Sequence, residues 1–217
     1  RIIENESEKY HYTTIFGSSD EEINKFETLI NTFINRKVDG LIISPPAKSE
    51  SLINNLQQQG IPFVLLDRVF PEIKTSYVIL DNFTASFDAV KHLIDSGRTR
   101  IGMITYQSDL FHLKERTSGY LSALKESNID FDKCWLKQVD IINDQSEIEK
   151  SIKELLSTDP QIDAVLFGSN MIAMHCLKYI NTLAIEVPHD LAIVSFDQAA
   201  ILDIFYSPVT YIKQHLE

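Results

Sequence analysis

The sequence predicts an α/β fold whose parallel sheets are divided between two Rossmann-like lobes. Short, largely apolar runs such as Ile61–Leu66 and Leu191–Phe196 are bounded by turn residues, which is typical of strands buried on both faces. These runs alternate with segments whose apolar residues follow a helical spacing, a pattern that favours right-handed βαβ units. The apolar runs suggest about ten strands, more than one sheet usually holds. We therefore expect two lobes of parallel strands with a ligand cleft between them, where the strand ends of both lobes meet.

The first lobe is expected over residues 1–97. Its strands are expected at Tyr12–Phe16, Val38–Ser44, Ile61–Leu66 and Tyr77–Leu80, where β-branched and aromatic residues concentrate. Its helices are expected at Arg1–Tyr10, around the apolar stripes Ile23–Ile34 and Leu52–Leu56, and over about Thr84–Ser96. Ser19 or Asp20 can cap the helix that carries Ile23, and Gly60 and Gly97 are suited to end helices.

The second lobe is expected over residues 98–209. Its strands are expected at Arg100–Thr105, Trp135–Ile142, Asp163–Phe167 and Leu191–Phe196, with a last extended piece at Val209–Lys213. The helices between them are expected around Arg116–Leu124, over Gln145–Leu156 and from Met171 to about Leu183. A loop, Tyr106–His112, leads to the first of these helices.

Composition and motifs argue for a binding module rather than an enzyme. The formal net charge of -11 opposes contact between this chain and nucleic-acid phosphates. The two cysteines and six histidines show no metal-ligand spacing, so we expect no metal, no cofactor and reduced thiols in the cytoplasm. No apolar run approaches the ~20 residues of a membrane span. The sequence also lacks GxGxxG, GxxxxGK[ST], HExxH and GxSxG, so an enzyme on a doubly wound fold has no catalytic constellation to support it.

Six short motifs stand out along the chain. They are VDGLII at residues 38–43, IPFVLLDR at 61–68, Asp81-Asn82, DAV at 163–165, VPHDLAIVSFD at 187–197 and SPVTYIKQ at 207–214. In this order and spacing they resemble the effector-binding core of the lactose-repressor/galactose-repressor family of bacterial transcription regulators, and the resemblance covers essentially the whole chain. VDGLI and VLLDR also occur in periplasmic sugar-binding proteins of the same fold. A sugar-binding protein of an uptake system is therefore the alternative function.

The resemblance implies a periplasmic-binding-protein-like fold of type I and a cytoplasmic, non-enzymatic ligand sensor. It implies a homodimer, for which we expect the helices of the first lobe to be used. It implies a sugar or sugar derivative as effector, and operator DNA bound by a helix-turn-helix headpiece that this chain lacks. Family cores also open with a strand that is missing here, so we expect this chain to be a fragment that returns to the first lobe near residues 210–217.

Two residues carried over from the resemblance lie in the second lobe. Asp197 follows a buried strand, and the family aspartate accepts hydrogen bonds from a ligand hydroxyl or amine; a helix N-cap is the other role that suits it. Arg116 begins the segment RTSGY, which matches the family pattern RxxGF/W, and its planar fork suits vicinal hydroxyls or a carboxylate. Its alternative is a surface helix arginine. His112, one helical turn earlier, faces the cleft in relatives, although a loop histidine is often solvated.

The remaining site residues lie at turns. Ser169 and Asn170 occupy a strand-to-helix turn where many relatives have Asn-Asp, and either residue can instead cap the following helix. Gln214 matches the family glutamine at the crossing between lobes, and Thr84 faces the cleft in some relatives. The pair Asp81-Asn82 is expected to fix the turn before Thr84.

Overall fold

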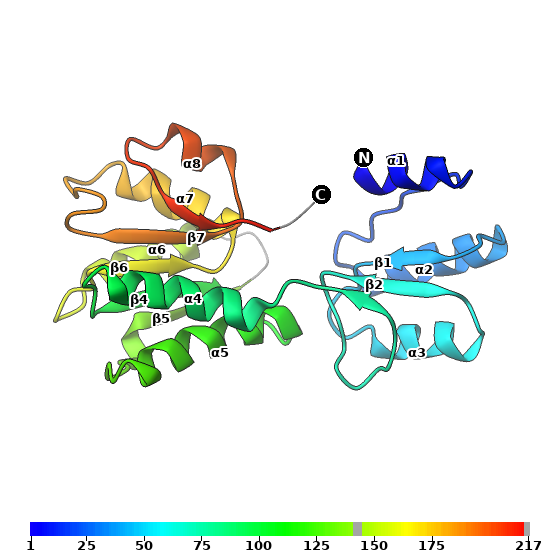
Figure 1. Cartoon of the computed structure of the whole chain (residues 1–217), viewed down its shortest axis with the longest axis horizontal. Coiled ribbons are helices and arrows are strands. Elements are labelled where there is room, and N and C mark those ends of the chain that lie inside the picture. Colours follow the sequence, from blue (N-terminus) through cyan, green and yellow to red (C-terminus); the bar gives the residue numbers. More distant parts are fainter. Residues whose placement is uncertain (141–144, 215–217) are drawn as a thin grey trace. The chain divides into compact units, whose positions relative to one another are not determined.

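A computed structural model of the chain describes residues 1–140 and 145–214, and these separate into two compact units, Arg1–Ile79 and Leu80–Gln214 (Figure 1). Each unit is built on one sheet of parallel strands. The strand order is β1-β2-β3 in the first unit and β5-β4-β6-β7-β8 in the second. The predicted α/β fold with parallel sheets is confirmed.

The first unit, Arg1–Ile79, alternates helices with its parallel strands. Its elements are α1 (Ile2–Lys9), α2 (Ile23–Asn35), β1 (Leu41–Ile43), α3 (Glu50–Gln58), β2 (Phe63–Leu66) and β3 (Tyr77–Val78). Phe26 and Ile30 of α2 are buried, as are Ile53 and Leu56 of α3. The apolar faces of these two helices, which we expected to serve dimerisation, thus contribute to the unit's own core.

The strand expected at Tyr12–Phe16 is wrong. These residues form no strand, although their composition is typical of one. A strand needs a neighbour with which to exchange backbone hydrogen bonds, and in the described part of this unit β1 pairs with β2 alone. Without a ladder the side chains of Tyr12, Ile15 and Phe16 stay exposed.

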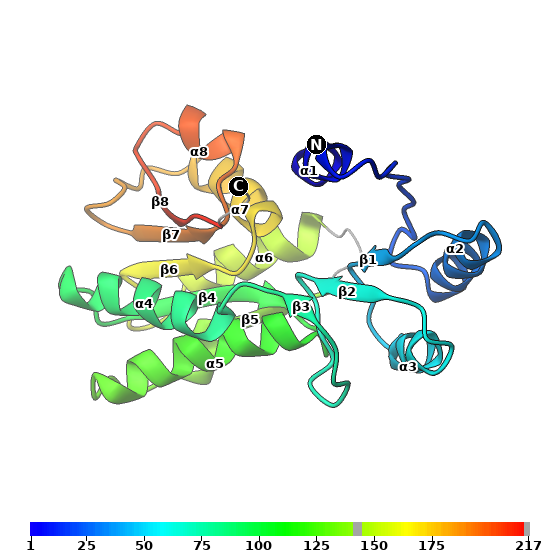
Figure 2. The ribbon, with the colours of Figure 1, turned by 45° about the vertical axis from the view of Figure 1, so that its right-hand side comes forward.

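The second unit, Leu80–Gln214, contains five parallel strands that lie side by side (Figure 2). Its strands are β4 (Ile101–Tyr106), β5 (Leu136–Val139), β6 (Ala164–Phe167), β7 (Ala192–Phe196) and β8 (Thr210–Ile212). Its helices are α4 (Asn82–Asp95), α5 (Phe111–Glu126), the short 3-10 helix η1 (Lys133–Trp135), α6 (Gln145–Leu156), α7 (Asn170–Ile180) and α8 (Ala200–Ile204). The expected strand Trp135–Ile142 begins one residue late, at Leu136, and residues 141–142 lie outside the described residues.

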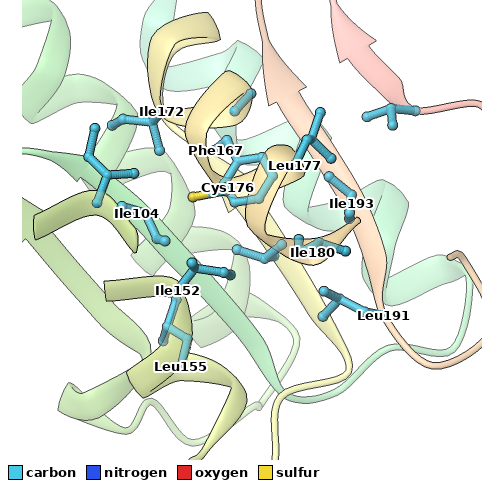
Figure 3. Packing of buried hydrophobic residues seen from close by; sticks show 14 of the residues in the cluster. Ile104, Ile152, Leu155, Phe167, Ile172, Cys176, Leu177, Ile180, Leu191 and Ile193 are labelled. Carbon is cyan, nitrogen blue, oxygen red and sulfur yellow. The ribbon is translucent and has the colours of Figure 1, made fainter. Parts of the chain in front are cut away.

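Helices cover both faces of the second sheet, because side chains of successive strand residues point to opposite faces. On one face Ile104, Phe167 and Ile193 pack with residues of α6 and α7, including Ile152 and Leu177 (Figure 3). On the other face a second set of strand residues packs with α4 and α5; it includes Met103, Leu166, Phe196, Val90, Tyr120 and Leu124. Strands buried on both faces explain the continuous apolar runs of the sequence.

The boundary between the two units falls before α4, whereas we expected it after Gly97. The reason is the apolar face of α4: Ala89, Val90 and Leu93 are buried in the cluster that α4 shares with α5 and the second sheet. The chain also stays in the second unit through Gln214, because β8 pairs with β7. Of the expected return to the first lobe near residues 210–217, residues 215–217 lie outside the described residues.

In the described residues, helices long and apolar enough to cross a lipid bilayer are not found.

Candidate ligand-binding site

The carboxyl edge of the second sheet gathers most of the residues singled out from the sequence. All five strands are parallel, so their carboxyl ends lie at one edge. Asp197 directly follows β7, and Gly168 and Ser169 directly follow β6. Gln214 comes two residues after β8. The order β6-β7-β8 therefore places these residues next to one another.

Asp197 is fixed by its backbone and by a neighbouring side chain. Its backbone lies in the left-handed region, with φ at 66°, a conformation that Asp and Asn adopt more readily than most other residues. Its N–H donates to the carbonyl oxygen of Ile212 at 3.1 Å, which extends the β7–β8 ladder by one bond. The Gln214 side-chain amide donates to Asp197 Oδ1. Two of the expected site residues are thus in direct contact.

Arg116 is a buried residue, with 4% of its surface exposed. Its Nε donates to Asn82 Oδ1 at 2.8 Å, and its Nη1 donates to the Gly168 carbonyl oxygen at 2.7 Å. The guanidinium carbon lies 4.0 Å from the centroid of the Phe196 ring, a cation–π contact. The surface-arginine alternative is therefore wrong, because this side chain joins α4, the end of β6 and the end of β7.

The spacing Arg116-x-x-Gly119 has a packing reason. A Cβ on Gly119 would lie 2.3 Å from the carbonyl oxygen of Phe83, so only glycine lets α4 approach α5 this closely. On α4, about one turn after Phe83, Ser86 Oγ donates to the Arg116 carbonyl oxygen at 2.6 Å. Ser86 lies four residues after Asn82 on the same face of α4, so one face of α4 contacts both the backbone and the guanidinium of Arg116.

The other expected site residues have mixed positions. Ser169 is the N-cap of α7, where its Oγ accepts the N–H of Ile172 at 3.2 Å, and Asn170 is the half-buried first residue of that helix. His112 is buried in the first turn of α5 rather than in a loop, and lies one turn before Arg116. Thr84 is exposed in the first turn of α4, where its N–H donates to Asp81 Oδ1 at 3.0 Å.

Three contributors were not assigned to the site from the sequence. Asn82 is buried against Arg116, although we expected it only to fix a turn. Gly168 offers its carbonyl to Arg116 and approaches Thr105 closely, since a Cβ on Gly168 would lie 2.9 Å from Thr105 Oγ1. Thr105 is fully buried, and within residues 1–140 and 145–214 its hydroxyl has no hydrogen-bond partner. These contacts leave little signal in the sequence, because each joins residues that are far apart in the chain.

The edge combines complementary hydrogen-bonding groups. Asp197 is an acceptor, Arg116 is a donor, and Ser169 and Gln214 can do both. Such a set suits a ligand that carries several hydroxyl groups, each of which donates and accepts. Among the described residues, His, Cys, Asp and Glu form no cluster of three that could hold a metal ion.

Solved structures share this fold. A transcription regulator CcpA of Lactococcus lactis matches with a TM-score of 0.86 at 24% identity, over 98% of this chain and 77% of that one. A protein of Actinobacillus succinogenes described as uncharacterized matches with a TM-score of 0.84 at 26% identity, over 98% of this chain and 78% of that one.

The sequence relatives include proteins named as transcriptional repressors. An HTH-type transcriptional repressor PurR of Aliivibrio salmonicida is 27% identical, over 98% of this chain and 63% of its own length. The catabolite control protein A of Priestia megaterium is 29% identical, over 99% of this chain and 64% of its own length. This chain thus spans less than two thirds of these relatives. The family described as "Periplasmic binding proteins and sugar binding domain of LacI family" matches residues 2–214, and the chain belongs to that family.

Proposed function

We propose that this chain is the effector-binding core of a bacterial transcriptional regulator that senses a sugar or a sugar derivative. The proposal is carried by the side chains at the carboxyl edge of the second sheet, where Gln214 contacts Asp197 and Arg116 contacts the Gly168 carbonyl and the Phe196 ring. In a family of sugar-binding domains, this edge offers one fixed acceptor beside buried and half-buried donors. Catalysis has no part in the proposal.

In the proposed regulator, DNA is bound by a helix-turn-helix headpiece outside this chain. The charge of -11 disfavours contact between the chain itself and phosphates, which is consistent with this division of labour. Effector binding then changes operator affinity only if the effector prefers one of two conformations of the regulator. The protein acts as a cytoplasmic homodimer in this proposal.

The relatives favour a regulator over the alternative, a sugar-binding protein of an uptake system. PurR of Aliivibrio salmonicida is named a repressor, and EndR of Paenibacillus polymyxa is named a probable transcriptional regulator. A helix-turn-helix encoded ahead of this segment would support the regulator, and a secretion signal in that place would support uptake.

Ligand binding by the full-length protein tests the proposal. The probes are D-ribose, D-glucose, D-galactose, cellobiose, D-glucose 6-phosphate and adenosine, each measured by thermal shift and then by calorimetric titration. We expect at least one probe to raise the melting temperature and to change the retention of operator DNA in a gel shift. A flat response to the whole panel would contradict a sugar or sugar-derivative effector.

A further inference from the structure

We propose that Asn82 is a positioning residue that sets the orientation of the Arg116 guanidinium for effector binding. This inference rests on the proposed function, in which Arg116 donates hydrogen bonds to the effector. Asn82 is not a ligand contact in this proposal. It acts through Arg116, whose Nε it engages from the first turn of α4.

The geometry leaves the guanidinium little freedom. A guanidinium is planar, so fixing Nε and one terminal nitrogen fixes the whole plane. Asn82 Oδ1 accepts from Nε at 2.8 Å, the Gly168 carbonyl oxygen accepts from Nη1 at 2.7 Å, and the Phe196 ring lies against the group. Of these three contacts, two come from strand ends that the sheet core holds, and only the Asn82 contact comes from a side-chain polar group. Of the two hydrogen bonds, the one to Asn82 can therefore be removed by a substitution, since Gly168 accepts through its backbone carbonyl.

Asn82 is itself held in place, as a positioning residue must be. Its Nδ2 donates to the carbonyl oxygen of Leu80 at 2.9 Å, and 3% of its surface is exposed. Asp81 precedes it and caps α4 by accepting the N–H of Thr84. This hydrogen bond spans Asn82 and holds the backbone of the first helical turn. Because the amide nitrogen is engaged by Leu80, the amide oxygen is directed at Arg116.

Asn82, Gly168 and Phe196 each engage Arg116 through an uncharged group. A carboxylate at residue 82 would bind the guanidinium more strongly, since attraction between opposite charges would add to the hydrogen bond. It would also compete with an acidic or hydroxylated effector for the positive charge. A neutral acceptor orients the arginine without placing a carboxylate against its positive charge, which is a reason for asparagine rather than aspartate at this position.

The test compares Asn82→Leu, which removes the acceptor at similar volume, with Asn82→Asp, which keeps an acceptor but loses the donor to Leu80. The first readout needs no ligand: the Nε–H resonance of Arg116 in the full-length protein labelled with ¹⁵N-arginine, assigned by its loss in Arg116→Lys. We expect rapid exchange of this proton with water in Asn82→Leu and protection in wild type and Asn82→Asp. Unchanged protection in a folded Asn82→Leu variant would overturn the inference.

The second readout is the affinity for the probe of the sugar panel that binds wild type most tightly. We expect Asn82→Leu to weaken binding about tenfold or more, in the direction of Arg116→Lys, on the scale of one hydrogen bond to a charged group. Lys91→Met is the matched control. It removes a contact between Lys91 Nζ and Ser127 Oγ, 3.1 Å long, that joins α4 to the far end of α5, and it should leave both readouts unchanged.

The outcomes separate the two proposals. If Arg116→Lys weakens binding and Asn82→Leu does not, Asn82 has no positioning role while the proposed function stands. If Asn82→Leu releases the Nε–H but neither variant alters affinity, Arg116 does not bind the effector and the proposed function loses its donor. Loss of affinity in Lys91→Met equal to that in Asn82→Leu would show that any loosening of α4 against α5 has the same effect, which would also overturn the inference.

Discussion

Replacement of Gly119 by alanine tests the packing of α4 on α5, and two opposing effects decide its sign. In a solvated helix the change would stabilise the protein by about 1 kcal/mol, because alanine is the better helix former. Here the new Cβ would lie 2.3 Å from the carbonyl oxygen of Phe83 and 2.9 Å from Ser86 Cβ. Ordinary contact requires separations of about 3.5 Å, so the helices must move apart by roughly 1 Å.

That movement has a cost that can be built up from the structure. Overpacking of this kind costs about 1–3 kcal/mol. The hydrogen bonds from Ser86 Oγ to the Arg116 carbonyl, 2.6 Å long, and from Arg116 Nε to Asn82, 2.8 Å long, would both be stretched. Each is worth about 1 kcal/mol. After the propensity gain is subtracted, we expect Gly119→Ala to lower the free energy of unfolding by about 2–4 kcal/mol.

Urea unfolding followed by tryptophan fluorescence is the appropriate assay. The chain has one tryptophan, Trp135, which is buried in the second unit and so reports on the unit that contains both helices. Ser118→Ala is the control, because Ser118 is an exposed neighbour on the same helix and its replacement should change stability by less than about 0.5 kcal/mol. Stabilisation of the protein by Gly119→Ala would refute the close approach of α4 to α5.

Three further predictions concern two buried groups and one half-buried histidine. Tyr120→Phe removes the hydroxyl that donates to the Ile101 carbonyl oxygen at 2.7 Å, and should lower the free energy of unfolding by about 1–2 kcal/mol in urea titrations; an unchanged midpoint would argue against this bond. Burial raises the pKa of the Cys176 thiol, so a disulfide reagent at neutral pH should modify Cys134 alone until the protein unfolds; two native thiols would contradict this. Burial lowers the pKa of His175, so its contribution to stability is full above the unfolded value of 6.5 and is lost as the pH falls below it. His175→Gln should therefore reduce the loss of stability on acidification through that pH, and an identical pH profile would contradict it.

The strands of the second sheet could be predicted because their signal is local. Ala164–Phe167 is apolar throughout and Leu191–Phe196 is apolar except for Ser195, as burial on both faces favours, and the residue after each run marks the carboxyl edge. Tyr12–Phe16 has an equally good local signal and forms no strand, because pairing depends on a neighbour that composition does not reveal. Whether a segment forms a strand was thus harder to predict than whether a strand is buried on both faces.

At the candidate site, the positions of single residues in the fold were more predictable than the contacts between them. The position of Asp197 follows from the end of a buried run, and its contact with Gln214 from the neighbouring strand β8. The contact between Asn82 and Arg116 joins two helices across 34 positions of sequence, so no local pattern reports it. The glycine three residues after Arg116 was the only local trace of that packing, and its meaning depends on the α4 backbone that it faces.

The most direct test of the proposed sensor is the affinity of Asp197→Asn for the sugar that binds wild type. Asparagine tolerates the φ of 66°, keeps the N–H that donates to Ile212, and still offers Gln214 an acceptor, so stability should change by less than about 1 kcal/mol. The lost charge should weaken binding by about 1.5–3 kcal/mol, which is roughly tenfold to a hundredfold. Calorimetric titration beside thermal melts separates the two effects. Weakened binding with an unchanged melting temperature is the predicted result; unchanged affinity in a variant that melts far lower would show that Asp197 is structural and that the ligand binds elsewhere.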